Sequence, residues 1–463
     1  MVDTTIPGES AQIVTTNPNT PKGSAGVIAI VGRFQKGNGN TPIYITDAQD
    51  GFKKMGNDSN YPGSKILEEI FKKDPDNNNY GATGAIGIKA GVSAGATCDL
   101  MDTTTTPVKV MTLTVPGGTW GNSLTATIST GTLSGKKLVI KSGSTVLDVF
   151  DNCANATALY NKIISTSSLN IKVTTGDLTK TLKDVADSAF SSGTEVADPA
   201  LTDLSDALDI LINEEYDILI FTDVPEDSSY ATIAAYLLER LANDKFTIAV
   251  LPIDSTKTVS QAEVVSEAIA SGLLFTVTQS ATVGTEELTD SETVARLAGA
   301  LAGLPVNESL TNKIISDITG LNRTFTKDEI YSLTESGITV LELKSRKNNN
   351  YGVVSAVTTS QEISDDGTKT AWSEQYAVRT LGYVCNKLNM KDYLGSTGKS
   401  KTKSSIEGEI SNRVNSMLEE GIAESIDVST NFDEANGELL YIDVSVKPLG
   451  ILKHIKKRVS MQE

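Results

Sequence analysis

The sequence predicts a mixed α/β protein with a mainly parallel α/β core, an inserted mostly β domain and a C-terminal α+β domain with extended terminal arms. Three observations support this fold class. Short apolar runs alternate with amphipathic helical stripes over residues 201–301, as in a parallel sheet covered on both faces. Residues 103–192 are instead rich in Thr, Ser and Gly, with frequent turns. The two ends, residues 1–22 and 458–463, have no obvious partner in the same chain.

The first 102 residues are expected to form an arm followed by the first part of the core. Residues 1–22 are polar and contain three prolines, which favours an extended arm, although an ordinary frayed terminus fits the composition equally well. Residues 23–102 then read as alternating strands and helices. We expect a capping box at Thr46 and Gln49 before a short helix. The other expected elements are a strand at Gly26–Arg33, a helix at Ser64–Lys73 and a strand at Ala85–Ala90.

Residues 103–192 are predicted to be an inserted, mostly β outer domain. Its expected strands are separated by turn-forming residues, and one helix is expected at 156–164. We place the strands at Val108–Val115, Leu124–Ile128, Lys137–Lys141, Val146–Phe150 and Leu169–Val173.

Residues 193–360 return to the α/β pattern and are predicted to complete the core. Three apolar runs are typical of buried parallel strands, at Asp217–Phe221, Phe246–Leu251 and Leu273–Thr278. Helical stripes lie before, between and after them. Two further strands, at Val340–Leu343 and Val353–Thr358, are expected to be joined by a loop over residues 347–352.

Residues 361–463 are predicted to be a C-terminal inner assembly domain ending in a strand arm. We expect one long helix at Trp372–Leu388 and a second at 405–420. Asn436-Gly437 lies between two strand-like runs, which predicts a hairpin. Apolar and polar residues alternate over 440–447, and Pro448 cannot donate to a ladder, so the strand should end there.

The composition argues against several classes of function. The formal net charge of −18 disfavours general binding of nucleic acid or anionic membrane, and no secretory signal or spanning segment is expected. Three scattered cysteines predict no disulfide framework. His454 is the one histidine of the chain, which excludes His-based catalytic triads and His-rich metal sites.

Three stretches resemble enzyme or metal sites without meeting their requirements. Gly395–Ser400 is similar to a phosphate loop, but the first required glycine is replaced by Tyr393. Asp74, Asp76 and Asn78 have calcium-loop spacing without the turn glycine or the bidentate glutamate. Asp223 follows a predicted core strand, where α/β enzymes often place a functional carboxylate, but it also simply enters the turn at Pro225. We therefore predict no catalytic residue, no cofactor and no metal.

Several stretches, in this order and spacing, resemble the contractile tail sheath family of phage tails and tail-derived bacteriocins. Residues 23–56 are similar to the opening strand, glycine-rich loop and short helix of that family, and Pro116–Asn122 resembles the turn that opens an inserted β domain. The second half carries the remaining similarities, at residues 300–321, Glu335–Ile338, Thr358–Thr359, Trp372 and Arg379.

The resemblance implies a structural subunit that polymerises helically around an inner tube and contracts to drive the tube through a target cell envelope. The implied partners are other copies of the chain, the inner tail tube protein, and baseplate and tail terminator proteins, with no nucleic acid and no direct membrane insertion. Assembly would occur in the host cytoplasm, and the product would be a virion tail or tail-like particle. The alternatives are an α/β nucleotide-binding hydrolase and a non-contractile surface or adhesion protein.

Two sets of residues are the candidate contacts of such a subunit. Strand donation between subunits would use the arms, represented by Ile6, Ile13, Val14, Arg458, Val459 and Met461. A basic cluster near the C-terminus is the candidate tube contact, formed by Lys453, Lys456, Lys457 and Arg458. The helix at 405–420, preceded by Lys399, Lys401 and Lys403, is a competing tube contact.

Overall fold

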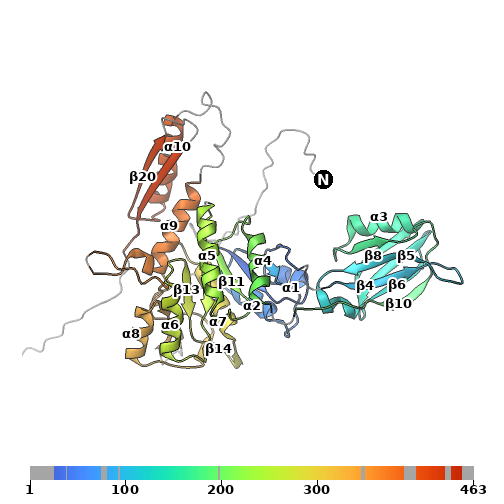
Figure 1. Ribbon diagram of the computed structural model, residues 1–463, viewed down its shortest axis with the longest axis horizontal. Helices are drawn as coiled ribbons and strands as arrows, with labels where there is room; N and C mark the ends of the chain where they lie inside the picture. The colour runs from blue at the N-terminus through green and yellow to red at the C-terminus, as the bar shows by residue number, and fades with distance from the viewer. Residues whose placement is uncertain are drawn as a thin grey trace, which may run out of the picture.

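The structure is a computed structural model, and Figure 1 shows the path of the chain. The residues that it describes are 26–37, 39–73, 81–91, 94–196, 199–243, 245–345, 350–365, 367–389, 403–432 and 440–450. Within these residues, no helix is both long enough and apolar enough to cross a membrane.

A seven-stranded sheet forms the centre of the molecule, in the order β17-β13-β12-β11-β1-β3-β2. All neighbouring strands are parallel except the edge strand β2, which runs antiparallel to β3. The strands are β1 (Val27–Gly32), β2 (Ile43–Ile45), β3 (Gly84–Lys89), β11 (Ile218–Phe221), β12 (Ile248–Pro252), β13 (Leu274–Val277) and β17 (Ile338–Thr339). The predicted mainly parallel core is confirmed.

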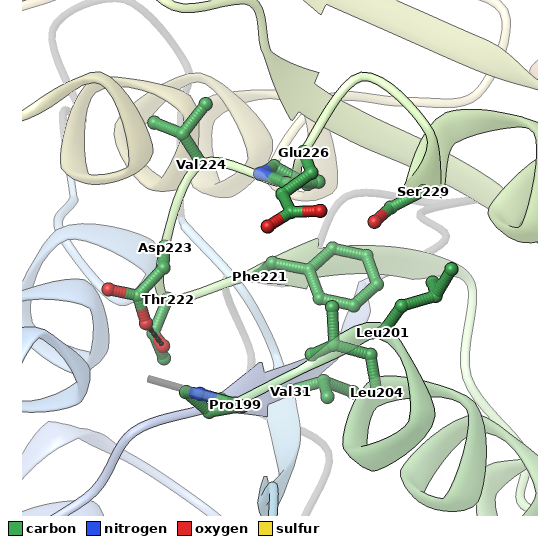
Figure 2. A pocket seen from close by; sticks show the side chains of 12 residues that line it. Val31, Pro199, Leu201, Leu204, Phe221, Thr222, Asp223, Val224, Glu226 and Ser229 are labelled. Atoms are coloured by element: carbon green, nitrogen blue, oxygen red, sulfur yellow. Dashed lines mark hydrogen bonds between the residues drawn. The ribbon is translucent and has the colours of Figure 1, made fainter. Parts of the chain in front are cut away.

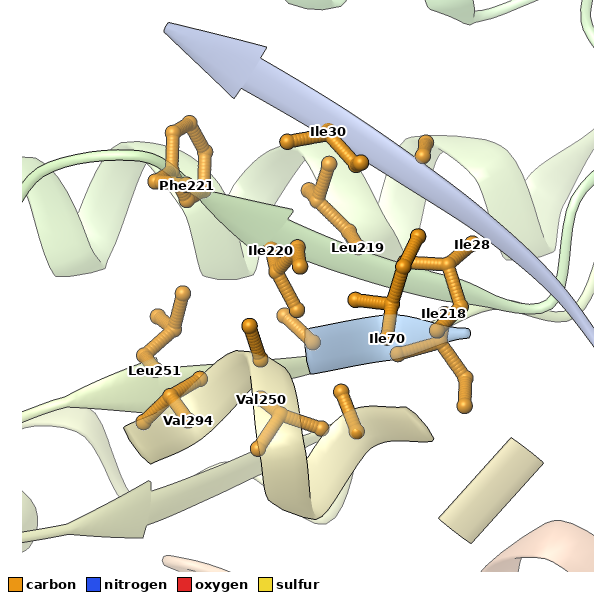
Figure 3. Close-up of a cluster of buried hydrophobic side chains, with 14 of the residues drawn as sticks. Ile28, Ile30, Ile70, Ile218, Leu219, Ile220, Phe221, Val250, Leu251 and Val294 are labelled. Carbon is orange, nitrogen blue, oxygen red and sulfur yellow. The ribbon is translucent and has the colours of Figure 1, made fainter. Parts of the chain in front are cut away.

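Helices cover both faces of this sheet, which explains why its strands are continuous apolar runs. On one face α1 (Ala48–Met55), α2 (Pro62–Ile70) and α7 (Asp290–Ala302) pack together. The other face carries α4 (Leu201–Leu211), α5 (Ser229–Ala242), α6 (Val259–Ile269) and α8 (Lys327–Glu335). Figure 3 shows Ile28, Leu219 and Val250 of the resulting core, with Ile70 of α2 and Val294 of α7 among the side chains that close it.

A separate β unit, residues 96–189, lies to one side of the core (Figure 1) and has a hydrophobic cluster of its own. Its two sheets have the orders β10-β6-β7-β8 and β4-β5-β9. The elements are β4 (Ala96–Met101), β5 (Lys109–Val115), η2 (Gly118–Ser123), β6 (Leu124–Thr130), β7 (Lys136–Ser142), β8 (Thr145–Cys153), α3 (Ala156–Thr166), β9 (Lys172–Thr175) and β10 (Val185–Ala189). Because β4 pairs with β5, this unit starts before the boundary at residue 103 that the sequence suggested.

The C-terminal region leaves the core through a helix. After the turn η3 (Ala371–Ser373), α9 (Gln375–Lys387) leads outward, and α10 (Lys403–Glu419) packs beside a two-stranded hairpin, as Figure 1 shows. The hairpin consists of β20 (Ser425–Phe432) and β21 (Leu440–Lys447). Smaller sheets are formed by β14 (Ala281–Val283), β15 (Glu286–Glu287) and β16 (Ile318–Leu321), and by β18 (Leu341–Ser345) and β19 (Asn350–Val353).

Several local expectations were wrong in detail. The N-cap of α1 is Asp47 rather than Thr46, because the Asp47 carboxylate accepts from the backbone N–H of Asp50. The expected helix Trp372–Leu388 is interrupted at Glu374, whose backbone is extended, so that a 3₁₀ turn precedes α9. β19 starts at Asn350, inside the segment that we expected to be a loop, because residues 350–353 pair with β18.

Candidate assembly interface

The hairpin β20–β21 is the candidate assembly site of the described chain. Its strands pair in antiparallel register over eight residues each, from Ser425 opposite Lys447 to Phe432 opposite Leu440. Within the residues that the structure describes, each strand is bonded to the other alone, so both outer edges lack a neighbouring strand. Unpaired edges of this kind are templates for a strand from another chain.

One face of the hairpin packs against α9 and α10, and the other face is exposed. Ile426, Val428 and Val444 point to the same face and pack with Val384 of α9 and Ile410 of α10. The opposite face exposes polar side chains: Asp427, Ser429, Asp443, Ser445 and Lys447. This alternation, read from the sequence as a half-buried strand, is confirmed, and β21 ends directly before Pro448 as predicted.

The hairpin unit is held to the core by hydrogen bonds as well as by packing. The side-chain amide of Asn307, just after α7, donates to the carbonyl of Gly421 at 2.6 Å. The guanidinium of Arg413 in α10 donates to the carbonyls of Lys387 and Asn389 at 3.1 and 3.0 Å. The position of the hairpin relative to the sheet therefore depends on α7 and α9, which are more than thirty residues away in sequence from β20.

The contact residues that the sequence predicts lie elsewhere in the chain. Ile6, Ile13, Val14, Val459 and Met461 of the arms lie outside the described residues. Lys453, Lys456, Lys457 and Arg458 of the basic cluster do so as well, as do Lys399 and Lys401 of the competing segment. These assignments therefore stay predictions.

An enzyme with this topology would bind its ligand at the carboxyl ends of β1 and β11. The connections from these adjacent strands run to opposite sides, through β3 and β12, so the switch point of the sheet lies between them. The cavity there has a volume of about 60 Å³ and is lined largely by apolar side chains, including Val31, Phe221 and Leu204 (Figure 2). It is far below the 300–1,000 Å³ (roughly) of typical ligand pockets.

Asp223 lies at this edge and has a structural partner. Its carboxylate receives the Nε–H of Arg33 at 3.0 Å, and the two side chains form an ion pair. The Thr222 hydroxyl donates to Asp223 at 2.7 Å and accepts from the backbone N–H of Arg33. Asp223 thus joins the ends of β1 and β11, which agrees with its interpretation as a turn residue. The sequence contained no local signal for this pair, because its members are 190 residues apart.

Other potential chemical groups are also accounted for in the described part of the chain. Cys98 and Cys153 are buried thiols, and burial raises the pKa of each. No cluster of three or more His, Cys, Asp or Glu side chains within the described residues could hold a metal ion. Asp74, Asp76 and Asn78, and the stretch Gly395–Ser400, lie outside the described residues.

Comparison with known proteins assigns this fold. Residues 199–359 match the family model of the phage tail sheath protein central domain. The sheath tail protein Lin1278 from Listeria innocua has a similar structure, with a TM-score of 0.71, 15% identity and 93% coverage of both chains. The sheath tail protein DSY3957 from Desulfitobacterium hafniense is similar with a TM-score of 0.63, 16% identity and coverages of 92% of this chain and 97% of that chain.

A third similar structure is the helical sheath of the anti-feeding prophage in its contracted state. It has a TM-score of 0.54 and 12% identity, with 99% of this chain and 100% of that chain covered. Comparison with curated protein sequences finds no significant match. Residues 199–359 therefore carry the central domain of the phage tail sheath protein family, and the chain as a whole has the fold of the solved tail sheath proteins.

Proposed function

We propose that this subunit polymerises helically around an inner tail tube and that contraction of the polymer drives the tube through a target cell envelope. Neighbouring copies are linked by strand donation, in which residues 1–22 and 458–463 add to the β20–β21 hairpins of neighbours. Such a head-to-tail contact does not close on itself and generates a helical filament. The end of the polymer contacts baseplate and terminator proteins.

The single observation that carries this proposal is the hairpin, whose two outer edges have no neighbouring strand among the described residues and which α9 and α10 hold away from the main sheet. A two-stranded hairpin is marginally stable by itself, and a third or fourth strand would bury more of its backbone and side chains. Strand links that stay bonded while whole subunits rotate would allow the lattice to shorten without breaking. The contracted helical sheath of the anti-feeding prophage, which has a similar fold, supports the same interpretation.

Electron microscopy of the purified protein tests the proposal. Wild-type protein is expected to form hollow tubes, and variants lacking residues 1–20 or 458–463 are expected to remain monomeric. Both truncations should leave the circular dichroism spectrum and the melting temperature nearly unchanged, because the described core does not include these residues. Normal tubes from either truncated protein would contradict strand donation by that arm.

We further propose that the basic segment 449–458 holds the sheath on the tube. Lys453, Lys456, Lys457 and Arg458 concentrate positive charge in a chain of net charge −18. Exposed ion pairs contribute only about 0.2–1 kcal/mol each and are screened by salt. Many such weak contacts would hold an extended sheath and still release it during contraction.

A further inference from the structure

A second cavity lies at the opposite end of the central sheet from the switch point. It has a volume of about 350 Å³ and lies between the amino ends of β11 and β12 and one side of α9. Its lining includes Asp217 and Phe246 from the ends of the strands, and Arg379, Tyr383 and Lys387 from the helix. It is about as large as the smaller ligand pockets of proteins.

The wall formed by α9 is fixed in place. Asn386 accepts a hydrogen bond from the backbone N–H of Phe246 at 3.1 Å, which connects the helix to the start of β12. Gly382 allows the helix to approach closely, because a Cβ atom at this position would lie 2.0 Å from the ring of Phe246. The cavity therefore cannot close by a simple shift of α9 toward the sheet.

A buried cation in this wall is incompletely paired. The guanidinium of Arg379 donates to the carbonyls of Leu304 and Pro305, at 3.0 and 3.5 Å, just beyond the end of α7. Its Nε–H is buried and has no hydrogen-bond partner among the described residues, and no carboxylate in that part of the chain lies within 4 Å of it. Burial lowers the pKa of Arg379 to about 10. Removing a cation from water without a contacting anion is unfavourable.

The remaining charged groups at the cavity differ in whether they have partners. Asp217 accepts from the backbone N–H of Val27 at 3.0 Å, and burial raises the pKa of its carboxyl, while that hydrogen bond and the charge of Arg379 oppose the shift. Glu215 pairs with Lys245 at 3.5 Å. The ammonium of Lys387, in contrast, contacts the ring of Tyr383, 5.4 Å from its centroid, and has no ion pair within the described residues. Of the cationic donors at the cavity, the exposed Lys387 ammonium is the one that an anion with oxygen acceptors can reach, and the buried Arg379 adds positive charge to the same wall.

We propose that this cavity binds a carboxylate, supplied in the assembled sheath by an acidic side chain of a neighbouring copy of the chain. The chain carries 58 acidic against 40 basic residues, so each copy has acidic side chains in excess. In a polymer, a tethered neighbour also presents its side chain at high effective concentration. This assignment of the neighbour rests on the proposed helical assembly, whereas carboxylate binding by the cavity does not.

Zero-length carbodiimide cross-linking of polymers tests the source of the carboxylate. Polymers are assembled from equal amounts of ¹⁵N-labelled and unlabelled chains, and the cross-linked peptides are identified by mass spectrometry. We expect isotopically mixed cross-links between Lys387 and an aspartate or glutamate, and none in the Lys387→Met variant. The exposed pair Lys447–Glu424 is an internal control, which should give cross-links within one chain. Lys387 cross-links confined to one chain, or none at all in intact polymers, would overturn the proposal.

Acetate binding by the free subunit tests the cavity independently of assembly. At constant ionic strength, replacing chloride by acetate should raise the melting temperature of the wild-type subunit in a saturable way. In Lys387→Met the concentration giving half of this shift should rise at least several-fold, whereas Lys447→Met should behave as wild type. A saturable shift in a protein that never polymerises would support carboxylate binding by the cavity. It would contradict a neighbouring copy as the source of that carboxylate. Equal responses of all three proteins would overturn the site itself.

Discussion

The central sheet and the C-terminal hairpin are both built from strands with apolar or alternating sequences. They differ in how many strand edges and faces are covered by other parts of the same chain. β11 has strand partners on both sides and helices on both faces, and its residues Ile218–Phe221 are all buried. β20 and β21 have one partner each in the described structure and one bare face. The core is therefore complete within one copy of the chain. In the described structure, the outer edges of the hairpin have backbone groups that could bond to a strand of another copy.

This difference separates folding from assembly. Substitutions in the core are expected to act on the free energy of unfolding, because burial of apolar side chains dominates the stability of a domain. Substitutions at the hairpin and arms should act mainly on polymerisation, because they remove little buried area from the free subunit. The following experiments test this separation, in decreasing order of their expected effect on unfolding.

Breaking the buried ion pair between α2 and α7 should have the largest effect. Glu69 has no exposed surface, and its carboxylate accepts from Arg296 at 3.0 Å. Glu69→Ala would leave the guanidinium buried beside Asp317 alone, and we expect the free energy of unfolding to fall by about 3–5 kcal/mol. Urea denaturation measures this loss. The exposed pair Lys447–Glu424 of the hairpin is the matched control, and Lys447→Ala should change stability by less than about 1 kcal/mol.

Truncating apolar side chains gives the second test. Leu219 in β11 is fully buried, and Leu219→Ala should lower the free energy of unfolding by about 2–5 kcal/mol through lost contacts and a residual cavity. Val444 in β21 is half-buried, and Val444→Ala should lower it by about 1 kcal/mol. The comparison is made by urea denaturation, with sedimentation to follow assembly. Equal losses would show that the hairpin belongs to the same cooperative unit as the sheet.

Removing the β unit should change the core little, because the two ends of the unit lie side by side. The backbone N–H of Thr194 donates to the carbonyl of Ala94 at 3.0 Å. Replacing residues 95–193 by two glycines should therefore preserve the core, and tubes of smaller outer diameter are expected by electron microscopy if the unit faces outward. Loss of soluble protein would show that the core requires the unit, and the lost contact to examine first would be the hydrogen bond from the buried Lys89 ammonium to the Gly117 carbonyl.

Reversing the charge of the basic segment should have no effect on unfolding. Changing Lys453, Lys456 and Lys457 together to Glu is expected to abolish co-assembly with the inner tube, while the sheath alone still polymerises and contracts. Co-sedimentation with tube protein at several salt concentrations measures the loss. Unaltered co-assembly, with unchanged salt dependence, would instead favour the region 399–420 as the tube contact.

The sequence by itself determined which core segments are strands and which are helices. It also carried the resemblance to tail sheath proteins. Apolar runs such as Asp217–Phe221 and Phe246–Leu251 are buried strands, and the alternation before Pro448 produces the hairpin partner β21. These patterns are local: strand and helix periods are properties of a few consecutive residues. The resemblance to tail sheath proteins, read from dispersed stretches, is confirmed by the family model over residues 199–359.

The tertiary structure alone decided which distant residues meet. Arg33 pairs with Asp223, Glu69 with Arg296, and the cavity beneath α9 joins Asp217 to Arg379. Each of these contacts joins residues more than 150 positions apart, and no local pattern marks such partners. The start of the β unit at β4 was missed for the same reason, because residues 96–101 become part of it only by pairing with β5. Local periodicity selects strands and helices, whereas partners depend on the path of the whole chain.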